Sequence, residues 1–216
     1  MTPDDTRAGF IRAQTRPAPA PLCPDIMAYQ ASEITPIWQA SEDFLDHHGI
    51  APPYWAFVWP GSAALARYSL DHPAALQGRR IIDFAAGSGV AGIAALRAGA
   101  AQVTAIDIDP MAGAALALNA ELNGVNLMID IADRVGSPLA ADLILCGDIC
   151  YESPMAARIL PWLRHLACST EIWLAEPGRA YAPREGFAPL ACYAVPVLRD
   201  LESCTTRTTH LVRLLP

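Results

Sequence analysis

The stretch that decides the fold is residues 81–92, Ile-Ile-Asp-Phe-Ala-Ala-Gly-Ser-Gly-Val-Ala-Gly. It begins as an apolar run, typical of a buried parallel strand, and continues through a glycine-rich turn into a helical pattern. Glycines at such a junction let the chain turn tightly and let a ligand approach the backbone closely. Gly87, Gly89 and Gly92 also satisfy the G-x-G-x-x-G spacing of nucleotide-cofactor sites. The segment predicts an α/β fold with a ligand beyond its first strand.

The pattern repeats on the carboxyl side of this segment. Apolar strand-like runs alternate with helical patterns, which predicts a parallel sheet with right-handed crossovers. The expected strands are 80–84, 102–106, 126–131, 141–146 and 171–175, and the expected helices are 89–98, 109–122 and one opening at 153. Two last strands, 190–197 and 205–214, have no convincing helix between them. The expected fold is a doubly wound, mostly parallel seven-stranded sheet with an antiparallel C-terminal strand pair.

Before this alternation lies an N-terminal helical extension, residues 1–50, expected to form one unit with a domain over residues 51–216. A short helix is expected around 8–14 and a helix over 36–47 that Gly49 ends. The Pro-rich stretch 17–24 is expected to be a linker or wrapping segment, and 26–31 a short strand. The aromatic, proline-flanked stretch 52–61 predicts a rigid apolar loop, followed by a helix from Ser62 to about Leu70.

Composition narrows the class of protein. The chain has 216 residues, 53% of them hydrophobic, which suits a single domain with a full core. A formal net charge of -7 and the absence of a basic cluster disfavour a nucleic-acid partner. No apolar run is long enough to span a membrane, no secretory signal is evident, and the six cysteines show no zinc spacing. We therefore expect a cytoplasmic protein without a metal site or a membrane partner.

Two acidic residues frame the glycine-rich turn. Asp83 ends the first strand, and Asp107 ends the second, where a carboxylate can accept both hydroxyls of a ribose. A dinucleotide and S-adenosylmethionine both contain such a ribose. Asp83 favours S-adenosylmethionine, because a carboxylate there would repel a pyrophosphate but attract a cationic amino-acid moiety. A dinucleotide fold also needs two mononucleotide halves, and only one is evident here.

Asp83 to Gly89 resembles motif I of the class I methyltransferases, acidic-x-Gly-x-Gly-x-Gly, with Ala85 in place of the first glycine. Alanine is tolerated there if its φ is negative. The resemblance implies an S-adenosylmethionine site in which Asp107 binds the ribose and Ile108 lies near the adenine. Asp130 and Asp133 are equally good candidates for the exocyclic amine of the adenine, and either can equally be a solvated loop carboxylate. The cofactor-side residues are Trp59, Asp83, Ala85, Gly87, Gly89, Asp107, Ile108 and Asp133.

The acceptor is expected beyond the fourth strand, at Asp148 and Tyr151. This Asp-x-x-Tyr resembles the corresponding motif of the seven-β-strand protein lysine methyltransferases, and Trp59-Pro60 resembles their Trp-Pro segment. The segments 53–61, 83–89, 107–110, 147–151 and 177–181 resemble the lysine methyltransferases of the electron transfer flavoprotein β-subunit and their bacterial homologues. Glu176 stands where that family commonly has Asp. The resemblance implies a protein substrate, the electron transfer flavoprotein β-subunit.

The residue chemistry suits transfer to an amine. Asp148 can orient a lysine amine or help it lose its proton. Tyr151, Trp59 and Trp55 can wall a narrow channel and stabilise a cation through their ring faces. Alternatively, Asp148 is a cap on the approach to the following helix, and Trp59 is core, as we expect for Phe57.

Other functions compete. The same channel would serve a small-molecule amine or a ribosomal protein. A nicotinamide-dependent oxidoreductase is disfavoured by Asp83 and by the single mononucleotide half. A non-catalytic cofactor-binding module is disfavoured by the paired Asp148 and Tyr151.

Overall fold

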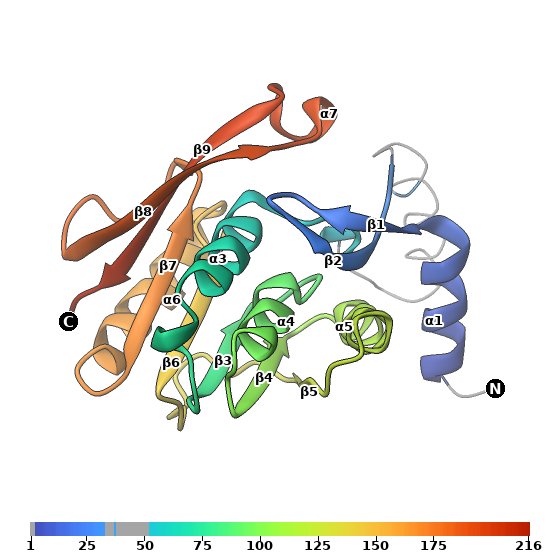
Figure 1. Ribbon diagram of the computed structural model, residues 1–216. Coiled ribbons are helices and arrows are strands. Elements are labelled where there is room, and N and C mark those ends of the chain that lie inside the picture. Colours follow the sequence, from blue (N-terminus) through green and yellow to red (C-terminus); the bar gives the residue numbers. More distant parts are fainter. Residues whose placement is uncertain (1–2, 33–36, 38–51) are drawn as a thin grey trace.

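The protein is described by a computed structural model that covers residues 3–32, 37 and 52–216 (Figure 1). Seven strands form one sheet in the order β5-β4-β3-β6-β7-β9-β8. They are β3 (Arg80–Phe84), β4 (Gln102–Asp107), β5 (Met128–Ile131), β6 (Leu143–Gly147), β7 (Glu171–Glu176), β8 (Phe187–Pro196) and β9 (Thr206–Leu214). The first five are parallel, whereas β9 is antiparallel to both β7 and β8. The predicted sheet, with its antiparallel C-terminal pair, is confirmed.

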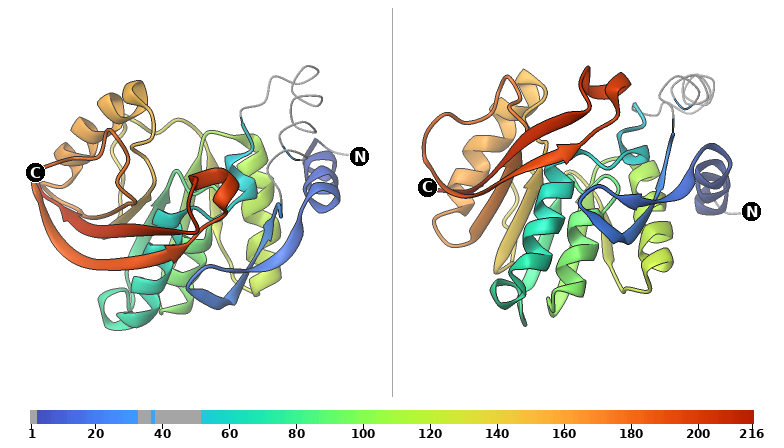
Figure 2. Two further views of the ribbon diagram at one scale, coloured as in Figure 1. Left: turned by 90° about the horizontal axis from the view of Figure 1, so that it is seen from above. Right: turned by 45° about the horizontal axis from the view of Figure 1, so that its top comes forward.

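Helices cover both faces of this sheet (Figures 1 and 2). The helices α3 (Pro60–Asp71), α4 (Val90–Arg97) and α5 (Pro110–Asn123) lie on one face, and α6 (Ser153–Leu166) lies on the other. Successive strand residues point to opposite faces. Ile81 therefore packs against α3, α4 and α5, while Ile82 packs against α6. Burial on both faces explains why the central strands are apolar throughout.

Local signals set the helix ends. The Asp109 side chain accepts a hydrogen bond from the Met111 backbone nitrogen at 2.8 Å, and Pro110 occupies the first turn of α5. Gly124 ends α5 with a φ of 64°, the left-handed conformation that glycine adopts without strain. Helix α3 begins at Pro60, earlier than predicted, because proline suits the first turn of a helix.

The N-terminal segment differs from the prediction of a linker. Helix α1 (Pro3–Gln14) leads into an antiparallel ribbon of β1 (Arg16–Ala20) and β2 (Cys23–Gln30). Pro17 and Pro19 lie within β1. The prolines are tolerated because each strand of a two-stranded ribbon has a free edge, where a missing N–H group has no partner to lose. The predicted helix over 36–47 lies outside the described residues, apart from residue 37.

The ribbon is hydrogen-bonded to α5. The Asn119 Oδ1 atom accepts from the Tyr29 backbone nitrogen at 2.8 Å, and the Asn123 Oδ1 atom accepts from the Met27 nitrogen at 3.0 Å. Asn119 is fully buried, and its Nδ2 atom also donates to the Ser88 carbonyl oxygen at 2.8 Å. One side chain thus joins the N-terminal ribbon to the glycine-rich turn.

Three short helices depart from the sequence expectations. The 3-10 helices η1 (Tyr54–Ala56) and η2 (Pro73–Ala75) lie before and after α3. The third, α7 (Arg199–Glu202), lies between β8 and β9, where no helix was expected. Figure 1 shows α7 at the tip of the long β8–β9 hairpin. Over 3–32 and 52–216, no helix combines the length and apolarity needed to cross a membrane.

Candidate active site

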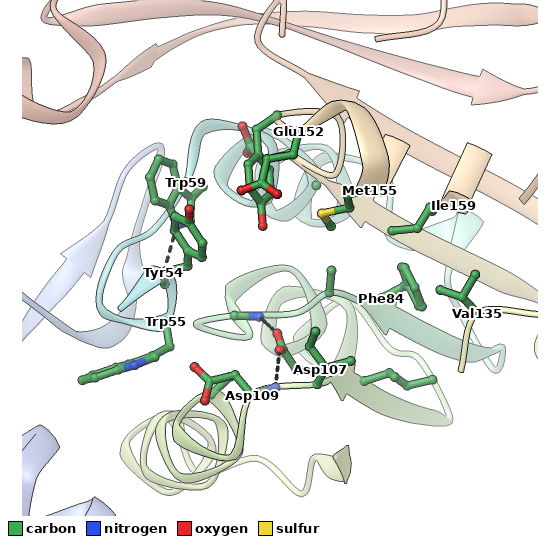
Figure 3. A pocket seen from close by; sticks show the side chains of 18 of the residues that line it. Tyr54, Trp55, Trp59, Phe84, Asp107, Asp109, Val135, Glu152, Met155 and Ile159 are labelled. Carbon is green, nitrogen blue, oxygen red and sulfur yellow. Dashed lines mark hydrogen bonds between the residues drawn. The ribbon is translucent and has the colours of Figure 1, made fainter. Parts of the chain in front are cut away.

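A cavity of about 660 Å³ opens beyond the carboxyl ends of β3, β4 and β6 (Figure 3). This is the edge where open α/β sheets bind ligands. Most of the sequence-predicted site residues lie in its wall, together with others from several separate segments of the chain. Residues lining it include Tyr54, Trp55, Trp59, Ala85, Gly87, Asp107, Ile108, Asp133, Asp148, Tyr151, Glu152, Arg179 and Leu201.

The glycine-rich turn forms one wall of the cavity. Ala85, Gly87 and Gly89 have φ values of 55°, 52° and 75°. The condition for tolerating alanine, a negative φ, is therefore not met at Ala85, and the alanine is held in the left-handed region that its Cβ disfavours. Gly89 starts α4 rather than lining the cavity, and a Cβ there would collide with Leu116.

Asp83 does not line the cavity. It is 3% exposed, and its Oδ2 atom accepts a hydrogen bond from the Gly92 backbone nitrogen at 2.8 Å. Burial raises the pKa of Asp83 to about 7, although this hydrogen bond opposes the shift. The carboxyl group therefore anchors the start of α4 beneath the turn, and direct contact with a cationic ligand is not evident.

Asp107 lies at the centre of the cavity wall, as expected (Figure 3). Its two oxygens accept from the backbone nitrogens of Gly87, at 2.9 Å, and Asp109, at 3.0 Å. The carboxylate is thereby fixed in orientation and keeps lone pairs directed to a ligand. Next to it, Ile108 is 72% exposed, so a large apolar side chain faces the opening.

The two loop carboxylates after β5 are separated by the structure. Asp133 lines the cavity, pairs with Arg158 and accepts from the Val135 nitrogen at 3.0 Å. Its pKa is lowered by the Arg158 side chain and by that backbone hydrogen bond. Asp130 instead pairs with Arg134 at 2.7 Å and is absent from the cavity lining. Asp133 is the better placed of the two candidates.

Asp148 is held on both sides. One oxygen accepts from the Gly61 backbone nitrogen at 2.5 Å, and the other from Arg179 Nη2 at 3.0 Å. Burial raises the pKa of Asp148 to about 6, while Arg179 and the Gly61 amide act in the opposite direction. Asp148 does cap a helix, but that helix is α3 rather than the following α6. A Cβ at Gly61 would lie 2.5 Å from the carboxylate, so only glycine fits there.

Aromatic rings line the cavity beside this carboxylate (Figure 3). The Tyr54 ring centroid lies 5.3 Å from that of Tyr151 and 5.8 Å from that of Trp59. Trp59 Nε1 donates to the Tyr54 carbonyl oxygen at 2.8 Å, which fixes the indole. Burial raises the pKa of Tyr151 to about 12, so this phenol is neutral at physiological pH. Phe57 is buried in the core, as expected, and Trp55 is buried and belongs to the cavity lining.

Three charged residues of this site were not assigned a role from the sequence. Arg179 pairs with both Asp148 and Glu202, and Arg207 pairs with Glu202. Arg179 lies in the segment 177–181, whose resemblance to the family was noted from the sequence, but that resemblance assigned no role to the arginine. Nothing in the local sequence marks Glu202 or Arg207, because their partners come from other parts of the chain.

Glu176 ends β7 behind Asp148. It is buried, and its two oxygens have no hydrogen-bond partner of ordinary geometry among the described residues. Burial and the Asp148 charge raise the pKa of Glu176 to about 7, while the neighbouring Cys150 and Arg179 oppose the shift. Glu176 is outside the cavity lining, so its direct neighbours are protein groups such as Asp148 and Cys150.

Comparison with known proteins agrees with this architecture. Residues 64–150 match the family model of ribosomal protein L11 methyltransferase. Among solved structures, magnesium protoporphyrin IX methyltransferase from Synechocystis with bound S-adenosylmethionine superposes with a TM-score of 0.51 at 19% identity, over 81% of this chain and 96% of that one. A ribosomal protein L11 methylase from Lactobacillus delbrueckii gives a TM-score of 0.51 at 18% identity, over 74% and 81%. These structures share the fold.

Several proteins are more similar to this chain in sequence than these solved structures are. The electron transfer flavoprotein β-subunit lysine methyltransferase of Xenopus laevis is 36% identical over 79% of this chain and 70% of its own length. The human protein of the same name is 35% identical over 73% of this chain and 61% of its own length. A Caenorhabditis elegans homologue is 32% identical over 73% and 71%. This chain therefore belongs to the electron transfer flavoprotein β-subunit lysine methyltransferase family, within the S-adenosylmethionine-dependent class I methyltransferases.

Proposed function

We propose that this chain transfers methyl groups from S-adenosylmethionine to lysine side chains of the electron transfer flavoprotein β-subunit. The observation that carries the proposal is the buried carboxylate of Asp148 beside the rings of Tyr54, Trp59 and Tyr151. An anionic group next to aromatic faces is a suitable environment for a cationic amine and its methylated products.

The cofactor half of the cavity fits S-adenosylmethionine. Asp107 is oriented by two backbone N–H groups and would accept the ribose hydroxyls. Ile108 would cover the adenine, and Asp133 would accept from its exocyclic amine. Gly87 and Ala85 would bring the backbone of the turn close to the amino-acid moiety, with Asp83 holding the turn from below and Gly89 opening α4. When bound, the cofactor supplies an electrophilic methyl group on a positively charged sulfur.

On the acceptor side, the residues act by positioning and by charge. Asp148 has a pKa of about 6, so it is mostly ionised at pH 7 and can accept a hydrogen bond from the incoming ammonium group. Tyr151 is neutral at that pH and can donate or accept through its hydroxyl group. Together with Trp59 and Tyr54, it would confine the alkyl stem of lysine and exclude water from the amine.

The relatives support the proposed substrate. The proteins that match most of the chain are named for the electron transfer flavoprotein β-subunit. A ribosomal protein is the second candidate, because the model of ribosomal protein L11 methyltransferase matches residues 64–150. That match leaves out Tyr54, Trp59, Tyr151 and Arg179, which surround the acceptor. It therefore informs on the cofactor half more than on the substrate.

Two coarser proposals accompany this one. We infer no nucleic-acid partner from the net charge of -7, and we propose a cytoplasmic location because the sequence shows no secretory signal. We also propose that the extension over residues 1–50 forms one unit with the domain over 51–216. Its described part supports this, because Asn119 bonds both to the N-terminal ribbon and to the glycine-rich turn.

The test is a methylation assay with two protein substrates. Purified chain and S-adenosylmethionine are incubated with electron transfer flavoprotein or with ribosomal protein L11, and intact masses are recorded. We expect whole methyl additions on the flavoprotein β-subunit alone. They should be strongly reduced in Asp148→Asn and retained in the control Asp130→Asn, whose carboxylate is absent from the cavity lining. Methylation of L11 alone, or of neither protein, would refute the proposal.

A further inference from the structure

The C-terminal hairpin reaches the acceptor site from the far edge of the sheet. Helix α7 lies at its tip, and Leu201 of that helix lines the cavity. We propose that Glu202 is a positioning residue for methyl transfer, which holds the Arg179 guanidinium against both Asp148 and Trp59. This inference rests on the proposed function, since it assigns to Asp148 the acceptor role described above.

The first support is the geometry around Arg179. Its Nη1 and Nη2 atoms donate to the two Glu202 oxygens at 3.1 and 2.5 Å, a bidentate pairing. Nη2 also donates to Asp148 at 3.0 Å, and the guanidinium carbon lies 5.8 Å from the Trp59 ring centroid. The same planar group therefore touches the acceptor carboxylate and one aromatic wall.

The second support is how Glu202 itself is held. It is 4% exposed, and Arg207 of β9 donates to its side chain at 2.9 Å and to its backbone oxygen at 3.1 Å. A carboxylate buried this deeply requires compensating charges, and the two arginines supply them. The hairpin thus presents Glu202 in one orientation.

The bonds to Glu202 restrict the conformations that the Arg179 side chain can adopt. A long arginine side chain populates many rotamers unless several bonds restrict it. Without Glu202, its remaining hydrogen bond would be the one to Asp148, because its buried Nε atom has no partner among the described residues. Arg179 could then leave the Trp59 face, and Asp148 would lose the cation that counters its burial.

The pH dependence separates this role from a simple charge effect. The groups that face Asp148 are the Gly61 amide, Arg179, Glu202 and Glu176. The Glu202 charge raises the pKa of Asp148, whereas Arg179 lowers it. If Glu202 acts only by charge, Glu202→Gln lowers the pKa of Asp148. If Glu202 positions Arg179, the same substitution displaces the arginine and raises that pKa.

The experiment compares the wild-type chain with Glu202→Gln, which keeps the shape of the side chain. We expect kcat for methylation of the flavoprotein to fall by ~10- to 100-fold, since small displacements in an active site have effects of this size. The acid limb of the pH profile should move to higher pH, with unchanged affinity for S-adenosylhomocysteine. The matched control is Glu171→Gln, which breaks the Arg79–Glu171 pair at the opposite end of β7 and should leave both readouts unchanged. An acid limb that moves to lower pH, or an unchanged kcat, would overturn the inference.

A substrate-free measurement keeps the inference distinct from the proposed function. Melting temperatures are recorded for Glu202→Gln, Asp148→Asn and the double variant, since Arg179 donates hydrogen bonds to both carboxylates. We expect the double variant to lose less than the sum of the two single losses. Additive losses would refute the link whatever the substrate is, whereas a wild-type chain inactive on the flavoprotein would refute only the proposed function. If Glu202→Gln does not fold, Arg207→Gln replaces it, because Arg207 is partly exposed.

Discussion

The two halves of the cavity are built in different ways. In the cofactor half, Asp107 and the glycine-rich turn are joined by backbone N–H groups within one βαβ unit. In the acceptor half, Asp148, Arg179 and Glu202 are joined by side chains from the ends of β6 and β7 and from the C-terminal hairpin. Hydrogen bonds from the backbone tolerate a change of side chain. A series of ion pairs between side chains is lost when any one of those side chains is replaced. We therefore expect substitutions in the acceptor half to affect turnover, and substitutions in the cofactor half to affect binding or stability.

The largest expected effect is at Asp148. Asp148→Asn removes the charge but keeps the size, and we expect kcat to fall by ~10²- to 10⁴-fold, the usual contribution of a proton-handling group. Affinity for S-adenosylhomocysteine, measured by calorimetry, should be unchanged because Asp107 is untouched. Weakened cofactor binding in this variant would break the division between the two halves.

Asp107→Ala tests the opposite half. It removes the acceptor for the ribose hydroxyls, and hydrogen bonds to a charged group contribute about 1.5–3 kcal/mol each. We expect affinity for S-adenosylhomocysteine to fall by ~10²-fold, from the lost hydrogen bonds. Asp130→Ala, which removes a carboxylate outside the cavity, serves as the matched control. Equal affinities in both variants would remove Asp107 from the cofactor site.

Asn119→Ala tests the link between the N-terminal ribbon and the glycine-rich turn. It leaves the Tyr29 nitrogen and the Ser88 oxygen without their partner, and each buried unsatisfied group costs about 1–3 kcal/mol. We expect a lower free energy of unfolding in urea and a single transition. Two separate transitions would show that the extension and the domain are independent units.

The pH profile sharpens the assignment of Asp148. Because its pKa is raised to about 6, the carboxylate becomes protonated as pH falls through that value. We expect kcat/KM to decrease toward low pH with a midpoint near this pKa, whereas S-adenosylhomocysteine affinity stays constant. A midpoint near the ordinary aspartate pKa would contradict the raised pKa of Asp148 in the folded protein.

The smallest expected effect is at Ala85, where a φ of 55° strains a residue with a Cβ. Ala85→Gly relieves that strain, worth about 1–2 kcal/mol, but adds freedom to the unfolded chain, which offsets roughly 0.4–1 kcal/mol. We expect a slightly higher melting temperature with little change in cofactor affinity. A clear loss of stability would indicate that the Ala85 methyl group packs usefully.

Features of the fold could be predicted from the sequence where they depend on interactions between residues close together in the chain. The strand 80–84 and the start of α5 at Asp109-Pro110 were predicted correctly, because apolar periodicity and helix caps act within a few residues. The ribbon strand β1 was missed, because its prolines are acceptable only once β2 pairs beside them. The left-handed Ala85 was missed because its conformation is imposed by the turn as a whole.

The sequence by itself determined the sheet, the cofactor class, and the position of Asp107, Asp148 and Tyr151 at the carboxyl-end cavity. These depend on local patterns that a short segment carries whatever surrounds it. Only the tertiary structure decided that Asp83 lies beneath the turn, that Asp148 caps α3, and that Glu202 reaches the acceptor site through Arg179. Burial and charge pairing between distant segments arise only when the chain has folded, because the low dielectric and the partner groups do not exist before then.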